Sequence, residues 1–416
     1  MIGQVKKLLS LLLLLAACTT VSAQEYMRIW QGGDNTKIPL TEVTYANDGA
    51  SFTADGVTYQ TSQVDSITFV HTITVTWDGV QATVEKGNVL GVECAVSGGD
   101  VVVTSTNTYN ELEFVLQGAS TDGSLTYTGS YKCKFYLNGL NLTSQTGAAL
   151  EILCGKRIDL ILNDGTENVL ADSPGGEQKG ALYCKGHLEV EGSGSLTVTG
   201  NTRHGICTKE YLELKKSTGS ITVNGAVSDG IHAGQYFLMN GGTVTVSGQQ
   251  GDGIQTEILT LDDDVTPNPE KEYNGQLFIN GGTVDVTVAG DDKKGIKSAD
   301  KMTVTGGTFI IVASGKGSKG ISVARHLLIN EDNGTTKMQI RATGGVYEDE
   351  VTEDESRCMG IKVTQNMAVT AGKIMVSNTG PKSRGIKVDG IYYRAPATVS
   401  ANEKFEVEST TIPPMD

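Results

Sequence analysis

The chain contains little proline and few aromatic residues, and its basic residues are outnumbered. Proline occurs 8 times, aromatic residues make up 6% of the sequence, and 33 basic residues face 48 acidic ones. The formal net charge of −15 at pH 7 repels a phosphate backbone, so we expect no nucleic-acid partner. It also repels an acidic polysaccharide unless a cation bridges the two, which leaves neutral sugars or calcium-assisted binding.

Long apolar runs are scarce as well. Residues 8–17 form an apolar run behind two lysines, and this run is too short to span a bilayer. Together with the small residues 21–23, it predicts a signal peptide over residues 1–23 and therefore a secreted, extracellular or periplasmic protein. The alternative is a lipobox that ends at Cys18, whose lipid would anchor the protein to the outer membrane surface.

Cysteine is rare, with 7 residues in the chain. Beyond the signal peptide the spacing is irregular, and four cysteines have the inward parity of a strand. We therefore predict buried free thiols, with a disulfide framework as the alternative in an oxidising compartment. The residues concerned are Cys94, Cys133, Cys154, Cys184, Cys207 and Cys358.

Glycine, in contrast, is abundant, with 52 residues, and it marks an internal repeat. A short pattern, mostly Gly-Ile followed by two residues, returns about every 24 residues. Two longer intervals each contain a polar insertion, at residues 259–274 and 344–356. The eight copies of the pattern begin at Ala181, Gly205, Gly230, Gly253, Gly295, Gly320, Gly360 and Gly385.

Each repeat holds three short segments of period two, separated by glycine turns that leave no room for a helix. Three strands cannot bury their apolar faces alone, whereas stacking each strand in parallel on its equivalent encloses a continuous core. We therefore predict an all-β, parallel β-helix of about ten coils with three strands per coil. The general preference for right-handed crossovers makes it right-handed. A β-propeller or an antiparallel sandwich is the alternative, but neither fits this register.

The repeat also divides the chain. Residues 71–178 have less regular strands and are predicted to form the N-terminal cap and first coils. Residues 24–70 form a strand-rich leader segment, and residues 179–391 form the repeated coils. Residues 392–416 are predicted to cap the open sheet edge at the C-terminus.

Stacking brings equivalent outward residues to about 4.8 Å from one another. The column before the repeated glycine contains Asp229 and Asp252, which we predict as ligands of a Ca²⁺ that offsets their repulsion. The alternative is a solvated ladder of charges, because lysines follow on the next coil. The column two residues after the glycine contains the candidate sugar-binding residues His232, Gln255 and Lys297.

A further column places His187, Tyr211 and Tyr236 on three consecutive coils. Rings in a row suit stacking against sugars, so we predict these residues to bind carbohydrate. The alternative is that the rings stack on each other. The acidic insertions border the charged columns and are predicted either to wall a groove there or simply to be soluble loops.

Part of the chain resembles a known family. The segments are residues 131–144, 147–150, 157–162 and 165–170, and the downstream repeats continue the match over roughly residues 73–395. They resemble the secreted carbohydrate-binding parallel β-helix domain family, whose fold is similar to pectate lyases of polysaccharide lyase family nine. The resemblance implies binding of plant cell-wall polysaccharide, including acidic pectic sugars, with bound calcium. Family members often carry Asp-Gly after the repeat core, and here only Asp389-Gly390 keeps it.

Three functions are therefore open. The leading hypothesis is a non-catalytic, monomeric protein that binds polysaccharide through the charged and aromatic columns. The second is a calcium-dependent lyase, in which Asp229 and Asp252 hold the ion while Lys294 or Lys297 abstracts a proton from the substrate. The third is a structural or adhesive surface protein, which requires no site at all.

Overall fold

The larger part of the chain is visible in a computed structural model, and every regular element is a strand except one short 3-10 turn, η1 (Thr61–Gln63). The all-β prediction is therefore confirmed. The predicted signal peptide and Cys18 lie outside the described residues. The chain forms two compact units, Met1–Val75 with Val84–Leu90, and Thr76–Thr83 with Gly91–Asp416. The structure describes residues 26–39, 43–87, 89–348, 355–395 and 398–416.

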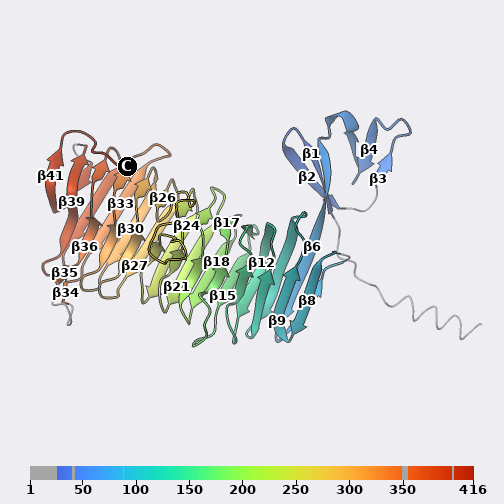
Figure 1. Cartoon of the computed structure of the whole chain (residues 1–416), viewed down its shortest axis with the longest axis horizontal. Coiled ribbons are helices and arrows are strands. Elements are labelled where there is room, and N and C mark those ends of the chain that lie inside the picture. The colour runs from blue at the N-terminus through green and yellow to red at the C-terminus, as the bar shows by residue number, and fades with distance from the viewer. Residues whose placement is uncertain (1–25, 40–42, 88, 349–354, 396–397) are drawn as a thin grey trace, which may run out of the picture. The chain divides into compact units, whose positions relative to one another are not determined.

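The larger unit is built mainly from three ladders of parallel strands, and Figure 1 shows strands of successive repeats lying side by side. Ladder A contains β9 (Gly99–Ser105), β11 (Gly123–Thr128), β13 (Leu150–Leu153), β16 (Gly180–Cys184), β19 (His204–Thr208), β22 (Ile231–Ala233), β25 (Ile254–Thr256), β28 (Lys294–Ser298), β31 (Lys319–Val323), β36 (Met359–Val363), the start of β39 (Arg384–Arg394) and part of β41 (Glu403–Ser409).

Ladder B follows ladder A along the chain in each repeat. Its strands are β10 (Leu112–Ser120), β12 (Cys133–Thr143), β14 (Arg157–Leu162), β17 (His187–Glu191), β20 (Leu212–Leu214), β23 (Phe237–Met239), β26 (Leu277–Ile279), β29 (Met302–Val304), β32 (Leu327–Ile329), β37 (Met367–Val369) and the end of β39.

Ladder C completes each repeat. It continues from the end of β12 through β15 (Glu167–Ala171), β18 (Ser195–Gly200), β21 (Ser220–Ala226), β24 (Thr243–Gln249), β27 (Thr283–Val288), β30 (Gly307–Ala313), β33 (Thr336–Ala342), β38 (Lys373–Asn378) and β40 (Val399–Ser400). Three parallel ladders of this kind agree with the predicted β-solenoid. The number of coils and the hand of winding stay predictions.

The inward column of ladder A has the predicted register. Each isoleucine pairs with its equivalent one coil away, and each is at most 2% exposed. Apolar side chains are thus withdrawn from water along the whole stack, at about 25 cal/mol per Å² of apolar surface. The paired residues are Ile206, Ile231, Ile254, Ile296, Ile321, Ile361 and Ile386.

The repeated glycine is required for a reason other than the turn between strands that the sequence predicted. A Cβ on Gly253 would lie 2.4 Å from the carbonyl oxygen of Gly295 on the next coil and 2.6 Å from a Val286 methyl group. This glycine therefore permits close approach of coils at the start of a strand. The turn between ladders B and C depends on other glycines, such as Gly242, whose φ is +83°.

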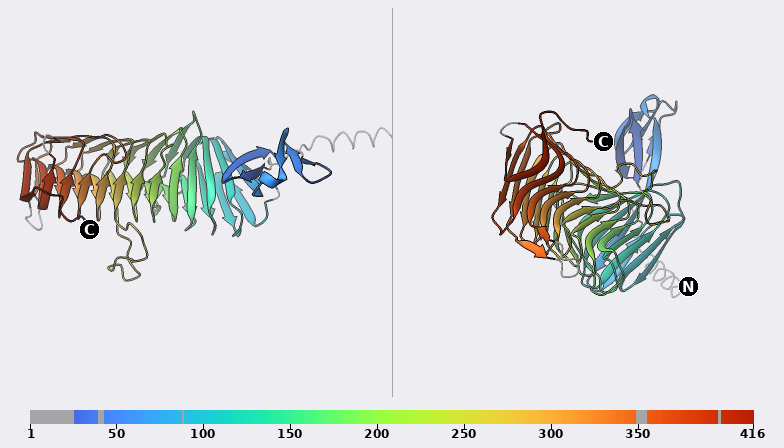
Figure 2. Two further views of the ribbon diagram at one scale, coloured as in Figure 1. Left: turned by 90° about the horizontal axis from the view of Figure 1, so that it is seen from above. Right: turned by 60° about the vertical axis from the view of Figure 1, so that its left-hand side comes forward.

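The two insertions lie where the intervals predict them. The first leaves the stack between β25 and β26, and Figure 2 shows it as the long yellow loop. The fixed spacing of the repeat misses β26 for this reason. The second insertion lies between β33 and β36 and forms a hairpin of β34 (Val346–Glu348) and β35 (Glu355–Arg357). Its acidic residues 349–354 lie outside the described residues.

The smaller unit pairs β1 (Tyr26–Gln31) in antiparallel fashion with β2 (Asp34–Pro39) and with β6 (Ser66–Asp78). The predicted boundary at residue 70 falls inside β6. Met27, Ile29 and Phe52 belong to its buried core. The remaining antiparallel strands of the N-terminal region are β3 (Val43–Tyr45), β4 (Ser51–Ala54), β5 (Val57–Gln60) and β8 (Val92–Ser97), and the region also contains β7 (Gln81–Glu85).

The C-terminal boundary differs in the same way, because residue 392 lies within β39. Beyond β39, β40 pairs in parallel with β38, and β41 pairs in parallel with β39 over two stretches. The C-terminal residues therefore continue the ladders by these two strands. Among the described residues, no helix is long and apolar enough to cross a membrane.

Five of the six cysteines of the larger unit are buried free thiols, as predicted, whereas Cys94 on β8 is only half-buried. Burial raises the pKa of the Cys184 thiol to about 12, so this group stays protonated at neutral pH. Small apolar thiols of this kind fill core space without cross-linking the coils. The buried free cysteines are Cys133, Cys154, Cys184, Cys207 and Cys358.

We predict that Ile296→Ala destabilises the larger unit by about 2–5 kcal/mol, because it leaves a cavity in a fully buried column. Ile310→Ala is the matched control, since Ile310 lies on β30 and is 41% exposed. It should cost less than about 1 kcal/mol. Urea unfolding followed by circular dichroism measures both, and equal losses would contradict the assignment of the core face.

Candidate functional site

The outer face of ladder A carries the predicted column of polar residues. Cys207 pairs with His232, His232 with Gln255, and Gln255 with Lys297, one coil after another. His232 is nevertheless only 9% exposed and Gln255 only 7%. Glu257, just before the first insertion, explains part of this burial, because one of its carboxylate oxygens accepts from Gln255 Nε2 at 3.1 Å. A fully solvated ladder of charges is therefore the wrong description of this part of the column.

A pocket of about 170 Å³ lies on this outer face, over β19 and β22. Strands of ladder A form its floor, and the start of the first insertion forms one side. Its lining residues are Lys179, Tyr183, Arg203, His204, Cys207, Thr208, Lys209, His232, Gly234, Glu257 and Leu259. The first insertion thus contributes Leu259 to the lining, and Glu257 lies just before it, whereas its aspartates do not line the pocket.

Three cations line the pocket. Lys179, Arg203 and Lys209 are exposed, and within the described ranges none of them has a carboxylate oxygen within 4.0 Å. Lys179 Nζ lies 5.5 Å from the centre of the Tyr183 ring, which attracts a cation to its face. Unpaired cations around one concave site are notable in a protein with a net charge of −15. They make the pocket an attractive place for an anionic ligand.

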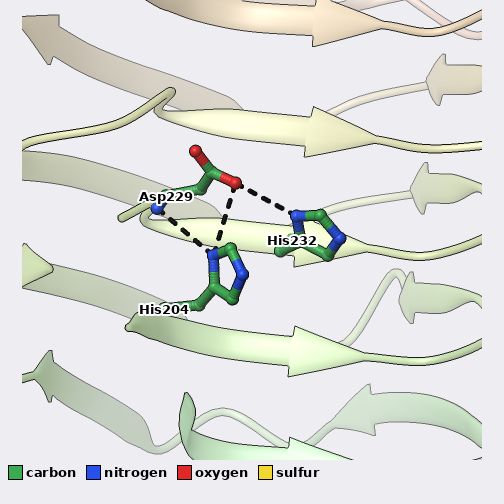
Figure 3. Close-up of side chains that lie close together, drawn as sticks. All are labelled: His204, Asp229 and His232. Atoms are coloured by element: carbon green, nitrogen blue, oxygen red, sulfur yellow. Dashed lines mark hydrogen bonds and ion pairs between the residues drawn. The ribbon is translucent and has the colours of Figure 1, made fainter. Parts of the chain in front are cut away.

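Two histidines and an aspartate meet beside the pocket floor. The Asp229 Oδ2 atom lies 3.3 Å from His204 Nδ1 and 3.0 Å from His232 Nδ1, as Figure 3 shows. His204 Nδ1 also accepts a hydrogen bond from the Asp229 N–H at 3.2 Å. The two imidazole rings are 4.4 Å apart between their centres. All three residues are less than 10% exposed.

The charges of these three groups differ. Burial opposes the charged form of His232, but hydrogen bonds to Asp229 and Glu257 outweigh it and raise the pKa of His232 to about 9. Burial lowers the pKa of His204, in agreement with a neutral ring whose Nδ1 accepts the Asp229 N–H. For Asp229, burial opposes the charged form, but the neighbouring His204 and His232 and the Asp252 N–H outweigh it and lower the pKa of the carboxyl group. The cluster therefore contains one carboxylate, one neutral imidazole and one imidazolium.

The predicted calcium ligands do not form a calcium site with each other. Asp229 Oδ1 accepts the backbone N–H of Asp252 at 2.8 Å, and Asp252 Oδ1 accepts that of Lys294 at 2.7 Å. The remaining oxygen of Asp252 lies 3.3 Å from Lys297 Nζ. Ca²⁺ requires 6–8 oxygen ligands. This pair offers two oxygens already engaged with the next coil and two that face nitrogen atoms, so the donor set does not fit the ion.

The two lysines predicted as lyase bases also have partners. Lys294 Nζ donates to the Asp292 carbonyl oxygen at 2.5 Å and lies 3.2 Å from its carboxylate. Lys297 Nζ donates to Gln255 Oε1 at 2.9 Å. Either amine would have to leave these contacts before it could accept a proton from a substrate.

Near the C-terminal end of ladder A, the Asp389 carboxylate of the retained Asp389-Gly390 pair also has partners. Asp389 forms an ion pair with Lys362 and another with Lys387, the second at 2.9 Å. Burial and the neighbouring Lys387 lower the pKa of Lys362 to about 8. The Asp389 carboxylate is therefore paired with two lysines of the column that lies two residues after the repeated glycine.

The aromatic column has the predicted register but a different use. The His187 and Tyr211 rings stack with centres 4.4 Å apart, and the Tyr211 and Tyr236 rings stack at 4.6 Å. The Tyr273 ring packs by its edge at 5.8 Å from Tyr236. The rings thus cover each other's faces, as in the alternative interpretation. Only ring edges are left for a sugar.

The same column fastens the first insertion to the solenoid. Glu210 forms ion pairs with His187 and with Lys271 of the insertion, the latter at 2.9 Å. A hydrogen bond from His187 lowers the pKa of Glu210 to about 2, with Lys271 adding to the effect. Gln235 Nε2 donates to the Glu272 carbonyl oxygen at 2.7 Å. These two contacts therefore hold the first insertion, which lies beside the pocket, against the strands.

Sequence reasoning missed most of the pocket. Lys179, Arg203 and Lys209 lie outside the strand columns, at the positions that flank two strands of ladder A, so no periodicity marks them. His204 stands in the column with Asp229, and its proximity to His232 could have been read from the register. The signal was a histidine one residue before one glycine and another two residues after the next.

We predict that the ion pairs of Glu210 with His187 and Lys271 make the free energy of unfolding fall at acid pH. Because folding lowers the pKa of Glu210 from its usual value of about 4.5 to about 2, its contribution is present above pH 4.5 and lost as the pH falls from 4.5 to 2. Glu210→Gln should cost about 2 kcal/mol at pH 7 and flatten this dependence. Denaturant unfolding at a series of pH values measures it.

Glu270→Gln is the control, because Glu270 is an exposed carboxylate in the same insertion. It should leave the pH dependence as in the parent protein. A Glu210→Gln variant that loses stability on acidification as steeply as the parent would contradict the assigned role of this ion pair.

The chain is similar to known proteins in sequence and to a solved structure. A carbohydrate-binding domain-containing protein from Acetivibrio thermocellus is 27% identical over 150 residues, which cover 34% of this chain and 49% of that protein. The chain thus spans about half the length of this curated relative. A solved polysaccharide lyase-like protein from C. thermocellum, a gadolinium derivative, has a TM-score of 0.46 and 19% identity over 79% of this chain and 98% of its own. A family model described as carbohydrate-binding domain-containing protein matches residues 97–384, well over half of the chain, so the protein belongs to that carbohydrate-binding family.

Proposed function

We propose that the protein binds an acidic polysaccharide through the pocket on the outer face of ladder A. The observation that carries this proposal is the group of three cations, Lys179, Arg203 and Lys209, without carboxylate partners among the described residues. They surround a concave site inside the segment that defines the carbohydrate-binding family. The polysaccharide partner follows from the family, and the preference for acidic sugars follows from the cations.

The chemistry of the pocket suits a sugar carboxylate. The guanidinium group of Arg203 has the planar geometry that binds a carboxylate through two parallel hydrogen bonds. The two lysines add positive charge at the rim, which attracts the rest of an anionic chain. The imidazolium of His232 adds a further positive charge against the carboxylates of Asp229 and Glu257. Four cationic groups thus face two anionic ones, and the site keeps a positive balance.

The size of the pocket limits what it holds. Its volume of about 170 Å³ is below the range of about 300–1,000 Å³ that is usual for drug-sized ligands. The pocket therefore accommodates one sugar unit, with neighbouring units over the open face of ladder A. Gln255 and Lys297 lie on that face, on the next coils. The exposed edges of the Tyr211 and Tyr236 rings offer further, weaker contacts.

The setting of this activity is also part of the proposal. The predicted signal peptide at residues 1–23 supports export, with the protein either secreted or held at the outer membrane surface through a lipid on Cys18. We propose that it acts as a monomer. Pectic sugars are the preferred substrate class, because they carry carboxylates. Calcium bound elsewhere on the chain or between two carboxylates of the sugar would assist binding. Lyase activity receives less support, because Lys294 and Lys297 are both engaged.

We predict that the protein binds polygalacturonate more strongly than a neutral glucan, and that binding weakens as salt rises from about 0.05 to 0.5 M because surface attraction is screened. Arg203→Ala should lower the affinity by about tenfold or more, the loss of roughly 1.4 kcal/mol from a charge-assisted pair. Affinity electrophoresis and calorimetry measure these changes.

Lys216→Ala is the matched control, since Lys216 is an exposed cation between β20 and β21 that does not line the pocket. It should bind like the parent protein. Equal weakening by both substitutions would indicate attraction to net charge alone. The release of unsaturated sugars from polygalacturonate would instead favour the lyase.

A further inference from the structure

We propose that His204, Asp229 and His232 bind one divalent transition-metal ion of the zinc type, with an open coordination position toward the pocket. One ligand atom from each of the three side chains lies within 4.8 Å of the other two. The set contains two imidazole nitrogens and one carboxylate oxygen. This composition suits Zn²⁺ and its neighbours in the first transition row and does not suit Ca²⁺.

The fold brings the three ligands together from three positions of the repeat. His204 and Asp229 occupy the column before the glycine on adjacent coils, and His232 occupies the column two residues after it, three residues from Asp229. The spacing between coils sets the separation of the first pair, and the strand sets that of the second. Figure 3 shows one oxygen of the Asp229 carboxylate joined by dashed lines to both histidine rings. The ligands are therefore placed by the rigid part of the solenoid.

The outer contacts orient two of the ligands for an ion. His232 Nε2 lies 3.3 Å from a carboxylate oxygen of Glu257, so its N–H is directed there. The other ring nitrogen, Nδ1, lies 3.0 Å from Asp229 Oδ2, and in the metal-free protein its proton occupies the space between them. A metal ion that displaces this proton would be bound by both atoms, and the positive charge between nitrogen and carboxylate would be kept. A carboxylate behind a ligand histidine is the usual outer contact of a metal-bound imidazole.

Asp229 divides its two oxygens between structure and site. Its Oδ1 accepts the N–H of Asp252 on the next coil, which fixes the orientation of the carboxylate. Its Oδ2 is the atom that faces both histidines. At His204 the ion would replace the Asp229 N–H as the partner of Nδ1, and this loses one hydrogen bond.

The pocket gives the ion access to a ligand. His204 and His232 line it, whereas the three ligands themselves are less than 10% exposed. A zinc site with three protein ligands keeps its fourth position for water or for an oxygen of a bound molecule. A sugar hydroxyl or carboxylate in the pocket is within this chemistry. The alternative occupant of the cluster is a proton between His232 Nδ1 and Asp229 Oδ2.

The test is direct titration of chelator-treated protein with Zn²⁺ by calorimetry, and with Co²⁺ by its visible absorption. We expect one ion per chain, with visible bands of cobalt bound through nitrogen. Asp229→Asn keeps the acceptor for the Asp252 N–H and removes the charged ligand, and His232→Gln removes an imidazole. Each should weaken metal binding by more than about 100-fold. Excess Ca²⁺ should not displace the ion.

His71→Gln is the control, because it removes an imidazole in the smaller unit, outside the cluster, and it should bind metal like the parent protein. Zn²⁺ should also raise the melting temperature of the parent and of this control but not that of Asp229→Asn. Absence of saturable binding by the parent, or equal affinity in Asp229→Asn and the parent, would overturn the proposal. Binding of polygalacturonate to chelator-treated protein is scored separately, so failure of the metal site leaves the sugar site decidable.

Discussion

The in-register stacking of each coil on the next is the constraint on which the rest of the structure depends. Parallel backbone hydrogen bonds fix equivalent residues about 4.8 Å apart, and one buried column of isoleucines follows from that spacing. Glycine is needed before each isoleucine because the carbonyl group of the next coil lies where a Cβ would be, as at Gly253. Any side chain that faces outward is therefore held beside its equivalents above and below.

This constraint explains why polar side chains on ladder A form hydrogen bonds to the backbone of the next coil. The side chains of His204, Asp229 and Asp252 each accept the backbone N–H of the residue one coil further on. Such contacts satisfy donors at the start of strands that the ladder leaves unpaired. A carboxylate with one oxygen used in this way has only the other oxygen for chemistry. Asp252 uses its second oxygen for Lys297, whereas Asp229 has its second oxygen beside two histidines.

Much of the fold could be predicted from the sequence, because equivalent residues of consecutive repeats pair with each other, and a repeat of about 24 residues therefore gives the strand register. The isoleucine column, the outward column from Cys207 to Lys387 and the places of both insertions are confirmed. The boundaries at residues 70 and 391 fall inside strands, because β6 and β39 continue across a change in composition. The pocket could not be predicted, because it depends on how the first insertion folds back, and no period describes that loop.

The candidate site was predicted in part for the same reason. The register placed His232 and Gln255 correctly on the outer face but could not show that Glu257 covers them. A crystal structure with a short oligogalacturonate bound tests the central claim most directly. The account predicts a sugar carboxylate against Arg203 in the pocket beside His232. A sugar bound away from ladder A, with this pocket empty, would contradict it.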